Sequence, residues 1–85
     1  MVVLVVGAED AAVREALDLV GVDGSVVVVD PSPARLARLE ERCADPRVWY
    51  LIGSGDVIPL PDGSVDEVVG DAAAAESVRV LGRAT

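Results

Sequence analysis

Gly7 and Asp30 are the residues whose types and spacing point most directly to chemistry. Gly7 follows the apolar run Val2–Val6 in a chain of 85 residues. Asp30 ends a second apolar run about twenty residues later, where an acidic side chain commonly accepts hydrogen bonds from the hydroxyls of a bound ribose. Two plainer interpretations stay open. Gly7 could simply make a sharp turn that needs a positive φ or a small residue, and Asp30 could belong to a helix-initiating Asp-Pro-Ser-Pro turn.

Glu9 and Asp10 follow the glycine turn, where a helix is expected to begin. Their carboxylates could hold an ammonium group of a ligand. Alternatively, Asp10 is the N-cap, and both acids interact favourably with the helix N-terminus. A pyrophosphate at this helix end would meet two carboxylates, which disfavours NAD as the ligand.

Composition excludes several classes of function. The net charge is −8, which argues against nucleic acid or an anionic membrane as a partner. The chain has no histidine, so we expect no metal site and no histidine-based catalytic triad. No apolar run approaches the roughly 20 residues that a membrane span requires. The single cysteine, Cys43, rules out an internal disulfide and favours a cytoplasmic location.

Two amphipathic helices are predicted in the first half of the chain. The first begins near Asp10 and stops at Gly21, with an inward stripe formed by Val13, Ala16, Leu17 and Val20. The second is capped by Ser32, has Pro33 at its first position, and ends before Asp45-Pro46. Leu36, Leu39 and Cys43 should face inward. The charged residues Arg35, Arg38, Glu40, Glu41 and Arg42 are interpreted as a solvated outer face.

Strands are predicted at Val2–Val6, Val26–Val29, Val48–Ile52 and Val65–Val69. In the third strand, Trp49 and Tyr50 point to opposite faces, and we expect both to pack. Residues 56–64 read as a loop, and Asp71 could cap a last helix over Ala72–Leu81. This alternation of strands and helices predicts one α/β domain over residues 1–85, with a parallel sheet.

In their order, these motifs resemble the class I S-adenosylmethionine-dependent methyltransferases, a Rossmann-like family. Val3–Gly7 resembles the family's first strand and glycine turn, Val26–Pro33 its second strand, and Gly55–Asp66 the loop into its fourth strand. The resemblance implies a sheet order of 3-2-1-4, helices on both faces, and S-adenosylmethionine as cofactor. It assigns cofactor contacts to Gly7, Ala8, Glu9, Asp30, Pro31, Asp56, Val57 and Asp71, with Asp56 on the adenine amino group. It identifies no catalytic residue.

The chain also departs from the family pattern. The family turn reads acid-x-Gly-x-Gly-x-Gly, and here Val5 replaces the acid, while Glu9 and Ala11 replace the second and third glycines. We also expect the family's C-terminal strands to be lacking, and with them the elements that form its substrate pocket. The isolated chain is therefore expected to show weak methyl transfer or none, and if it is active, the resemblance implies an S-adenosylmethionine-dependent methyltransferase.

Three functions remain open. The first is a methyltransferase-like domain that binds S-adenosylmethionine or S-adenosylhomocysteine. The second is an inactive interaction module, a homodimer formed through the edge of the fourth strand or through a sheet face that few elements cover. The third is another nucleotide-binding Rossmann-like domain.

Overall fold

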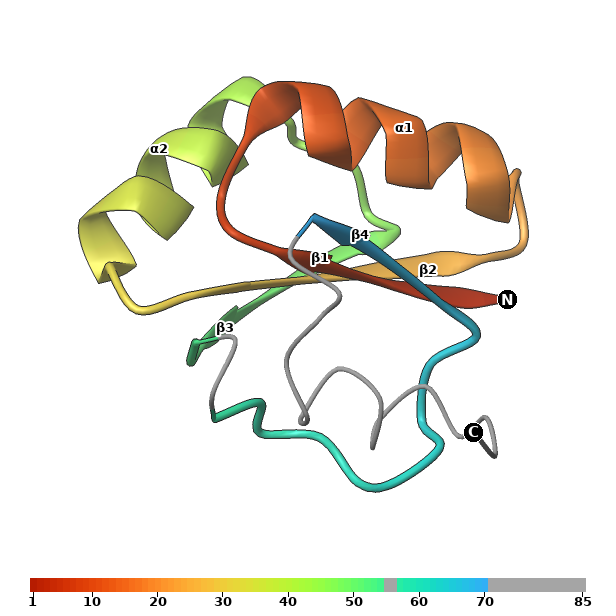
Figure 1. Cartoon of the computed structure of the whole chain (residues 1–85). Coiled ribbons are helices and arrows are strands. Elements are labelled where there is room, and N and C mark those ends of the chain that lie inside the picture. The colour runs from red at the N-terminus through yellow and green to blue at the C-terminus, as the bar shows by residue number, and fades with distance from the viewer. Residues whose placement is uncertain (55–56, 71–85) are drawn as a thin grey trace.

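Among the described residues, four parallel strands form one sheet in the order β3-β2-β1-β4 (Figure 1). The computed structural model describes residues 1–54 and 57–70. Along the chain the elements are β1 (Val2–Val6), α1 (Asp10–Val20), β2 (Ser25–Asp30), α2 (Pro33–Arg42), β3 (Val48–Ile52) and β4 (Glu67–Gly70). The predicted Rossmann-like α/β unit and its strand order are confirmed.

Both described helices cover one face of the sheet (Figure 1). Successive side chains of a strand point to opposite faces, so Val3 and Val5 of β1 turn toward the helices. They pack with residues of β2 and β3 and with the inward stripes of α1 and α2. This core contains Val3, Val5, Val13, Ala16, Val20, Val26, Val28, Leu36, Leu39 and Val48. Valine suits these strands because β-branched side chains pack well on a pleated surface.

The loop between β3 and β4 covers part of the opposite face. Ile58 and Val65 of this loop are each 3% exposed and form a second core with Leu4 and Val29. The loop expected over residues 56–64 is confirmed for its described part, 57–64. The last helix, predicted over Ala72–Leu81, lies outside the described residues.

β4 begins two residues later than predicted. Val65 is a buried anchor of the loop rather than the first residue of the strand. Asp66 then forms a reciprocal pair with β1, because its backbone N–H donates to the Val2 carbonyl and its carboxylate accepts from the Val2 N–H, both at 2.7 Å. The strand ends at Gly70. Its φ is +101°, and an added Cβ would lie 2.6 Å from the Val6 carbonyl oxygen, so a larger residue would not fit here.

The two aromatic residues of β3 differ in environment. The Tyr50 ring packs against the helix-side core, and its hydroxyl donates to the Cys43 carbonyl oxygen at 3.0 Å. Trp49 points to the other face and is 62% exposed, so its interpretation as a packing residue is wrong. β3 is an edge strand, and at Trp49 no described element covers it.

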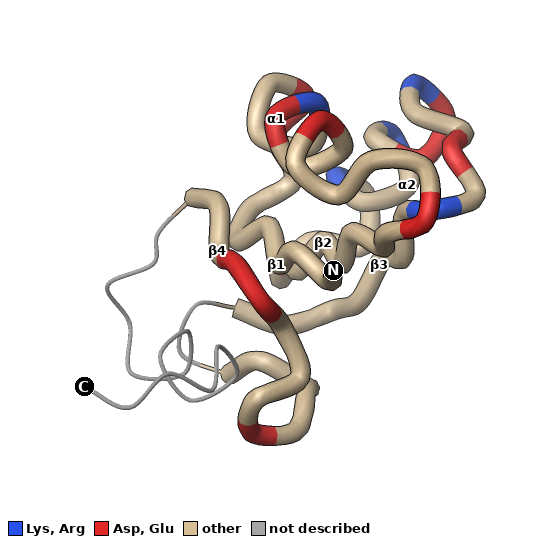
Figure 2. Tube along the Cα trace, turned by 90° about the vertical axis from the view of Figure 1, so that its right-hand side faces the viewer, with Lys and Arg blue, Asp and Glu red and all other residues tan. Residues whose placement is uncertain are grey.

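Charged residues of both signs are concentrated in the helical layer (Figure 2). Arginines of the described residues lie on α1, on α2 and in the connection to β3, interspersed with acids, whereas β4 and the loop before it carry only acids. None of the described helices has the length and apolar character that crossing a membrane would take.

Candidate functional site

The carboxyl ends of the four described strands lie at the same edge of the sheet, because these strands are parallel. Ligands of open α/β sheets bind outside this edge. Gly7 follows β1, Asp30 ends β2, and Gly53 follows β3. Backbone hydrogen bonds join them: the Gly7 N–H donates to the Val29 carbonyl at 2.8 Å, and the Gly53 N–H to the Asp30 carbonyl at 3.2 Å. The two residues singled out by spacing are therefore neighbours.

The Gly7 turn needs its glycine for backbone conformation. Its φ is +101°, a backbone conformation that residues other than glycine rarely adopt. A Cβ added at this position would have no atom within 4 Å. The interpretation as a turn requiring a positive φ is confirmed. The empty space beside the turn also leaves room for a ligand to approach the backbone.

Asp30 is a buried acid held by two turns. Its carboxylate is 1% exposed and accepts hydrogen bonds from the backbone N–H groups of Ala8, at 3.0 Å, and of Ser32, at 2.8 Å. An Arg35 guanidinium nitrogen lies 3.4 Å from Oδ2. Buried charges are generally paired and hydrogen-bonded in this way, because leaving water costs several kcal/mol otherwise. Asp30 thus ties the β1–α1 turn to the β2–α2 turn.

The start of α1 differs from the prediction. Glu9, not Asp10, occupies the N-cap position, with extended backbone angles (φ −118°, ψ 129°) and no hydrogen bond from its side chain to the helix. Asp10 is the first helical residue, and its carboxylate pairs with the Arg42 guanidinium at 3.1 Å. Because the extended backbone conformation of Glu9 is open to any residue, this position does not require the glycine that the family turn has here. The exposed Glu9 side chain stands beside the helix N-terminus.

The remaining predicted contacts divide into two groups. Pro31 is exposed beside Asp30, and Val57 is 66% exposed, with its N–H donating to the Ser54 carbonyl and hydroxyl, each at 3.2 Å. Asp56 and Asp71 lie outside the described residues. The structure therefore brings together Gly7, Ala8, Glu9, Asp30 and Pro31, around the β1 and β2 turns.

Arg35 is a site residue that the sequence pattern missed. The spacing assigned it to a solvated outer face of α2, but it reaches back to Asp30. Arg42 likewise pairs with Asp10 of the other helix. The ion pair between Arg35 and Asp30 depends on the conformation of the turn between β2 and α2. Helical periodicity does not describe that turn, so the pair could not be predicted from it.

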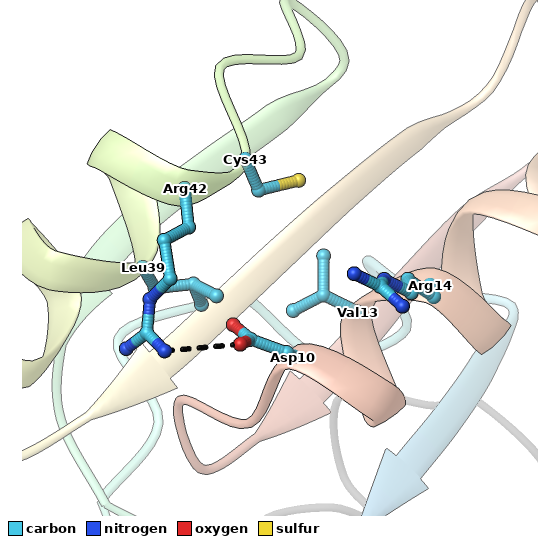
Figure 3. A pocket seen from close by; sticks show the side chains of 6 residues that line it. All are labelled: Asp10, Val13, Arg14, Leu39, Arg42 and Cys43. Atoms are coloured by element: carbon cyan, nitrogen blue, oxygen red, sulfur yellow. Dashed lines mark hydrogen bonds and ion pairs between the residues drawn. The ribbon is translucent and has the colours of Figure 1, made fainter.

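A cavity of about 270 Å³ lies between α1 and α2 (Figure 3). Val13 and Leu39 form its apolar floor, and the Asp10–Arg42 ion pair crosses its rim. Cys43 was expected to be a core residue; its side chain does pack against the helix-side core, but it also lines this cavity. The cavity shares no residue with the group around Asp30.

The shifted pKa values belong to the connection between α2 and β3. Arg47 donates side-chain and backbone hydrogen bonds to Asp45, which lowers the pKa of that carboxyl to about 2. The same pairing raises the pKa of the Arg47 guanidinium. Burial, together with the nearby Cys43, Glu40 and Asp45, raises the pKa of Tyr50 to about 12. Asp45 and Arg47 lie in the connection between α2 and β3, and Tyr50 lies within β3. Their hydrogen bonds stabilise that connection.

Among residues 1–54 and 57–70, no three cysteine, aspartate or glutamate residues lie close enough together to form a group that could hold a metal ion.

Comparison with known proteins gives one family. Residues 4–81 match the family model described as a methyltransferase domain. The matched region begins within β1 and takes in both glycine and acid turns of the candidate site. No curated protein matches the chain.

Proposed function

The chain belongs to the methyltransferase domain family, and on that premise we propose that it binds S-adenosylmethionine or its demethylated product, S-adenosylhomocysteine. The proposed site is the carboxyl edge of the sheet, around the Gly7 turn and Asp30. The observation that carries the proposal is the Asp30 carboxylate, which ends β2 directly beside the β1–α1 turn. Among Rossmann-like folds an acid at this point accepts hydrogen bonds from the hydroxyls of a ribose.

The residues of the edge fit this cofactor better than they fit a dinucleotide. Asp30 supplies acceptors for the ribose, and the space beside Gly7 admits a ligand close to the backbone. The exposed carboxylate of Glu9 suits the ammonium group of an amino acid and opposes a phosphate at the helix N-terminus. Pro31 and Val57 present exposed apolar surface for a base.

When bound, S-adenosylmethionine supplies a methyl group on a sulfonium, and its transfer depends mainly on holding a nucleophile in line with that methyl. The contribution proposed for this chain is to bind and orient the adenosyl and amino acid parts. The described residues end with β4, and in the family the acceptor is held by elements that follow this strand. The proposal therefore concerns binding rather than turnover.

Isothermal titration calorimetry with S-adenosylmethionine, S-adenosylhomocysteine and NAD tests the proposal. We expect heat from the first two ligands and none from NAD. Heat from NAD alone would favour a different nucleotide-binding function, and no heat from any of the three would contradict the proposal.

We also propose, as a second candidate, that the chain forms a homodimer through the β4 edge. Among the described strands β4 is the last of the sheet and pairs with β1, and strands at the edge of a sheet are a common site of pairing with a second chain. Ile58 and Val65 cover part of the face opposite the helices, which favours the edge over that face. One chain has a mass of 8.8 kDa. Sedimentation equilibrium at micromolar concentration should give twice that mass. A monomer would contradict this proposal.

A further inference from the structure

Arg35 lies where its side chain can control access to Asp30. Its backbone N–H donates to the Ser32 hydroxyl at 3.3 Å, which fixes the residue in the first turn of α2. From there the side chain returns toward β2, and its Nη1 lies 3.4 Å from Asp30 Oδ2. The arginine side chain is 54% exposed and the Asp30 side chain only 1% exposed. The guanidinium therefore stands between a buried carboxylate and solvent.

The Asp30 carboxylate has few acceptor positions left. Each carboxylate oxygen offers about two. The Ser32 N–H uses one on Oδ1, and the Ala8 N–H uses one on Oδ2. A ribose diol would need one further position on each oxygen. Because the guanidinium lies against Oδ2, it covers one of the two positions that the diol requires.

We propose that Arg35 competes with ribose hydroxyls for Asp30, so that a ligand binds only after the guanidinium has swung away. This inference rests on the proposed function, since it assigns a regulating residue to the same site. It makes Arg35 a positioning residue that sets the affinity of the chain for adenosyl ligands.

The displacement should cost little. The contact is long for a charge-assisted hydrogen bond, which usually spans about 2.7–2.9 Å. One partner is more than half exposed, and such ion pairs contribute weakly to stability. Removing the Arg35 guanidinium should therefore increase the affinity of the chain for adenosyl ligands by roughly two- to fivefold.

Arg35→Met tests the proposal, because methionine keeps a long apolar side chain and cannot donate to Asp30. Arg38→Met is the matched control, since it removes the same charge from the next turn of α2. Circular dichroism establishes that both variants fold. Calorimetry with S-adenosylhomocysteine should then give two- to fivefold tighter binding for Arg35→Met and an unchanged affinity for Arg38→Met.

A second pair of ligands separates competition from a general effect on the fold. NMR titration with adenosine should reproduce the gain in Arg35→Met, whereas 2′,3′-dideoxyadenosine, which lacks both hydroxyls, should bind the wild type and the variant equally.

The outcomes distinguish the two proposals. Binding by the wild type with equal or weaker binding by Arg35→Met would overturn the competition and leave the proposed function standing. An equal gain for both adenosine ligands would also overturn it. Absence of binding to wild type and variant alike would overturn both. Binding only by Arg35→Met would support the competition and contradict the proposed function of the wild-type chain.

Discussion

The backbone N–H of Ala8 donates a hydrogen bond to the Asp30 carboxylate across 3.0 Å, which joins residues 22 positions apart in the chain. This contact gives the acid at the end of β2 a structural role, whatever ligand it binds. Asp30 accepts a hydrogen bond in the turn before α2, as the turn interpretation predicts, and it also contacts the turn after β1. Its interpretation as a ribose-binding residue stays a prediction.

Asp30→Ala should be strongly destabilising. It leaves the N–H groups of Ala8 and Ser32 without their buried acceptor, which should cost about 3 kcal/mol of unfolding free energy. Asp30→Asn retains one acceptor oxygen and should cost less. Urea unfolding followed by circular dichroism measures both. Asp23→Ala, at an exposed position before β2, is the control and should change stability by less than about 0.5 kcal/mol. Equal effects at Asp30 and Asp23 would contradict the role of the buried carboxylate.

Gly7→Ala should lower stability by about 1–2 kcal/mol, although the added methyl group meets no atom within 4 Å. The cost arises from the backbone, which would have to hold alanine at a φ of +101°. Thermal or urea unfolding measures the change. Gly→Ala replacements at compatible positions are stabilising, because they restrict the unfolded chain. A more stable Gly7→Ala variant would therefore show that the positive φ is not required.

The architecture was predictable because burial leaves a simple pattern in the sequence. Continuous apolar runs predicted three of the strands, and the apolar stripes with Gly21 and Ser32 predicted the helices, the end of α1 and the start of α2. The start of β4 was misplaced because Val65 is equally apolar as a loop anchor or as a strand residue. The predicted burial of Trp49 was wrong because a residue of an edge strand has the same local sequence pattern as a residue of an interior strand.

The site was less predictable than the fold. Spacing indicated that Gly7 and Asp30 meet, because parallel strands bring their carboxyl ends together. It could not reveal the orientation of the Asp30 carboxylate or its pairing with Arg35, since both depend on turn conformations. For the same reason the sequence pattern predicts Asp10 as the N-cap of α1, whereas Glu9 occupies that position.

Ile58→Ala should destabilise the chain by about 2–4 kcal/mol, because the side chain is 3% exposed in the core opposite the helices. Its neighbour provides a matched control. Val57 is 66% exposed, so Val57→Ala should change the unfolding free energy by less than about 0.5 kcal/mol. Chemical denaturation compares the two. Similar small effects would mean that the β3–β4 loop does not seal this face of the sheet.

Alkaline pH should destabilise the fold through Tyr50. Burial raises its pKa to about 12 from a usual value of 10.0, so the folded chain holds the phenol proton more tightly than the unfolded chain. Stability should consequently fall as pH rises from about 10 to about 12. The chain contains one tyrosine, so phenolate absorbance reports this residue alone. It contains no lysine, whose usual pKa would fall in the same window. Tyr50→Phe should remove the pH dependence in this window, and a phenolate transition near 10 in the folded chain would refute the assignment.

Titration of the isotopically labelled chain with S-adenosylhomocysteine, followed residue by residue in amide NMR spectra, tests the central claim most directly. Binding at the carboxyl edge of the sheet predicts the largest shifts at Gly7 and at the Ala8 and Ser32 amides that donate to Asp30. Arg14 and Cys43, at the cavity between the helices, should shift little. Spectra unchanged at millimolar ligand, or shifts confined to the helix cavity, would contradict the account.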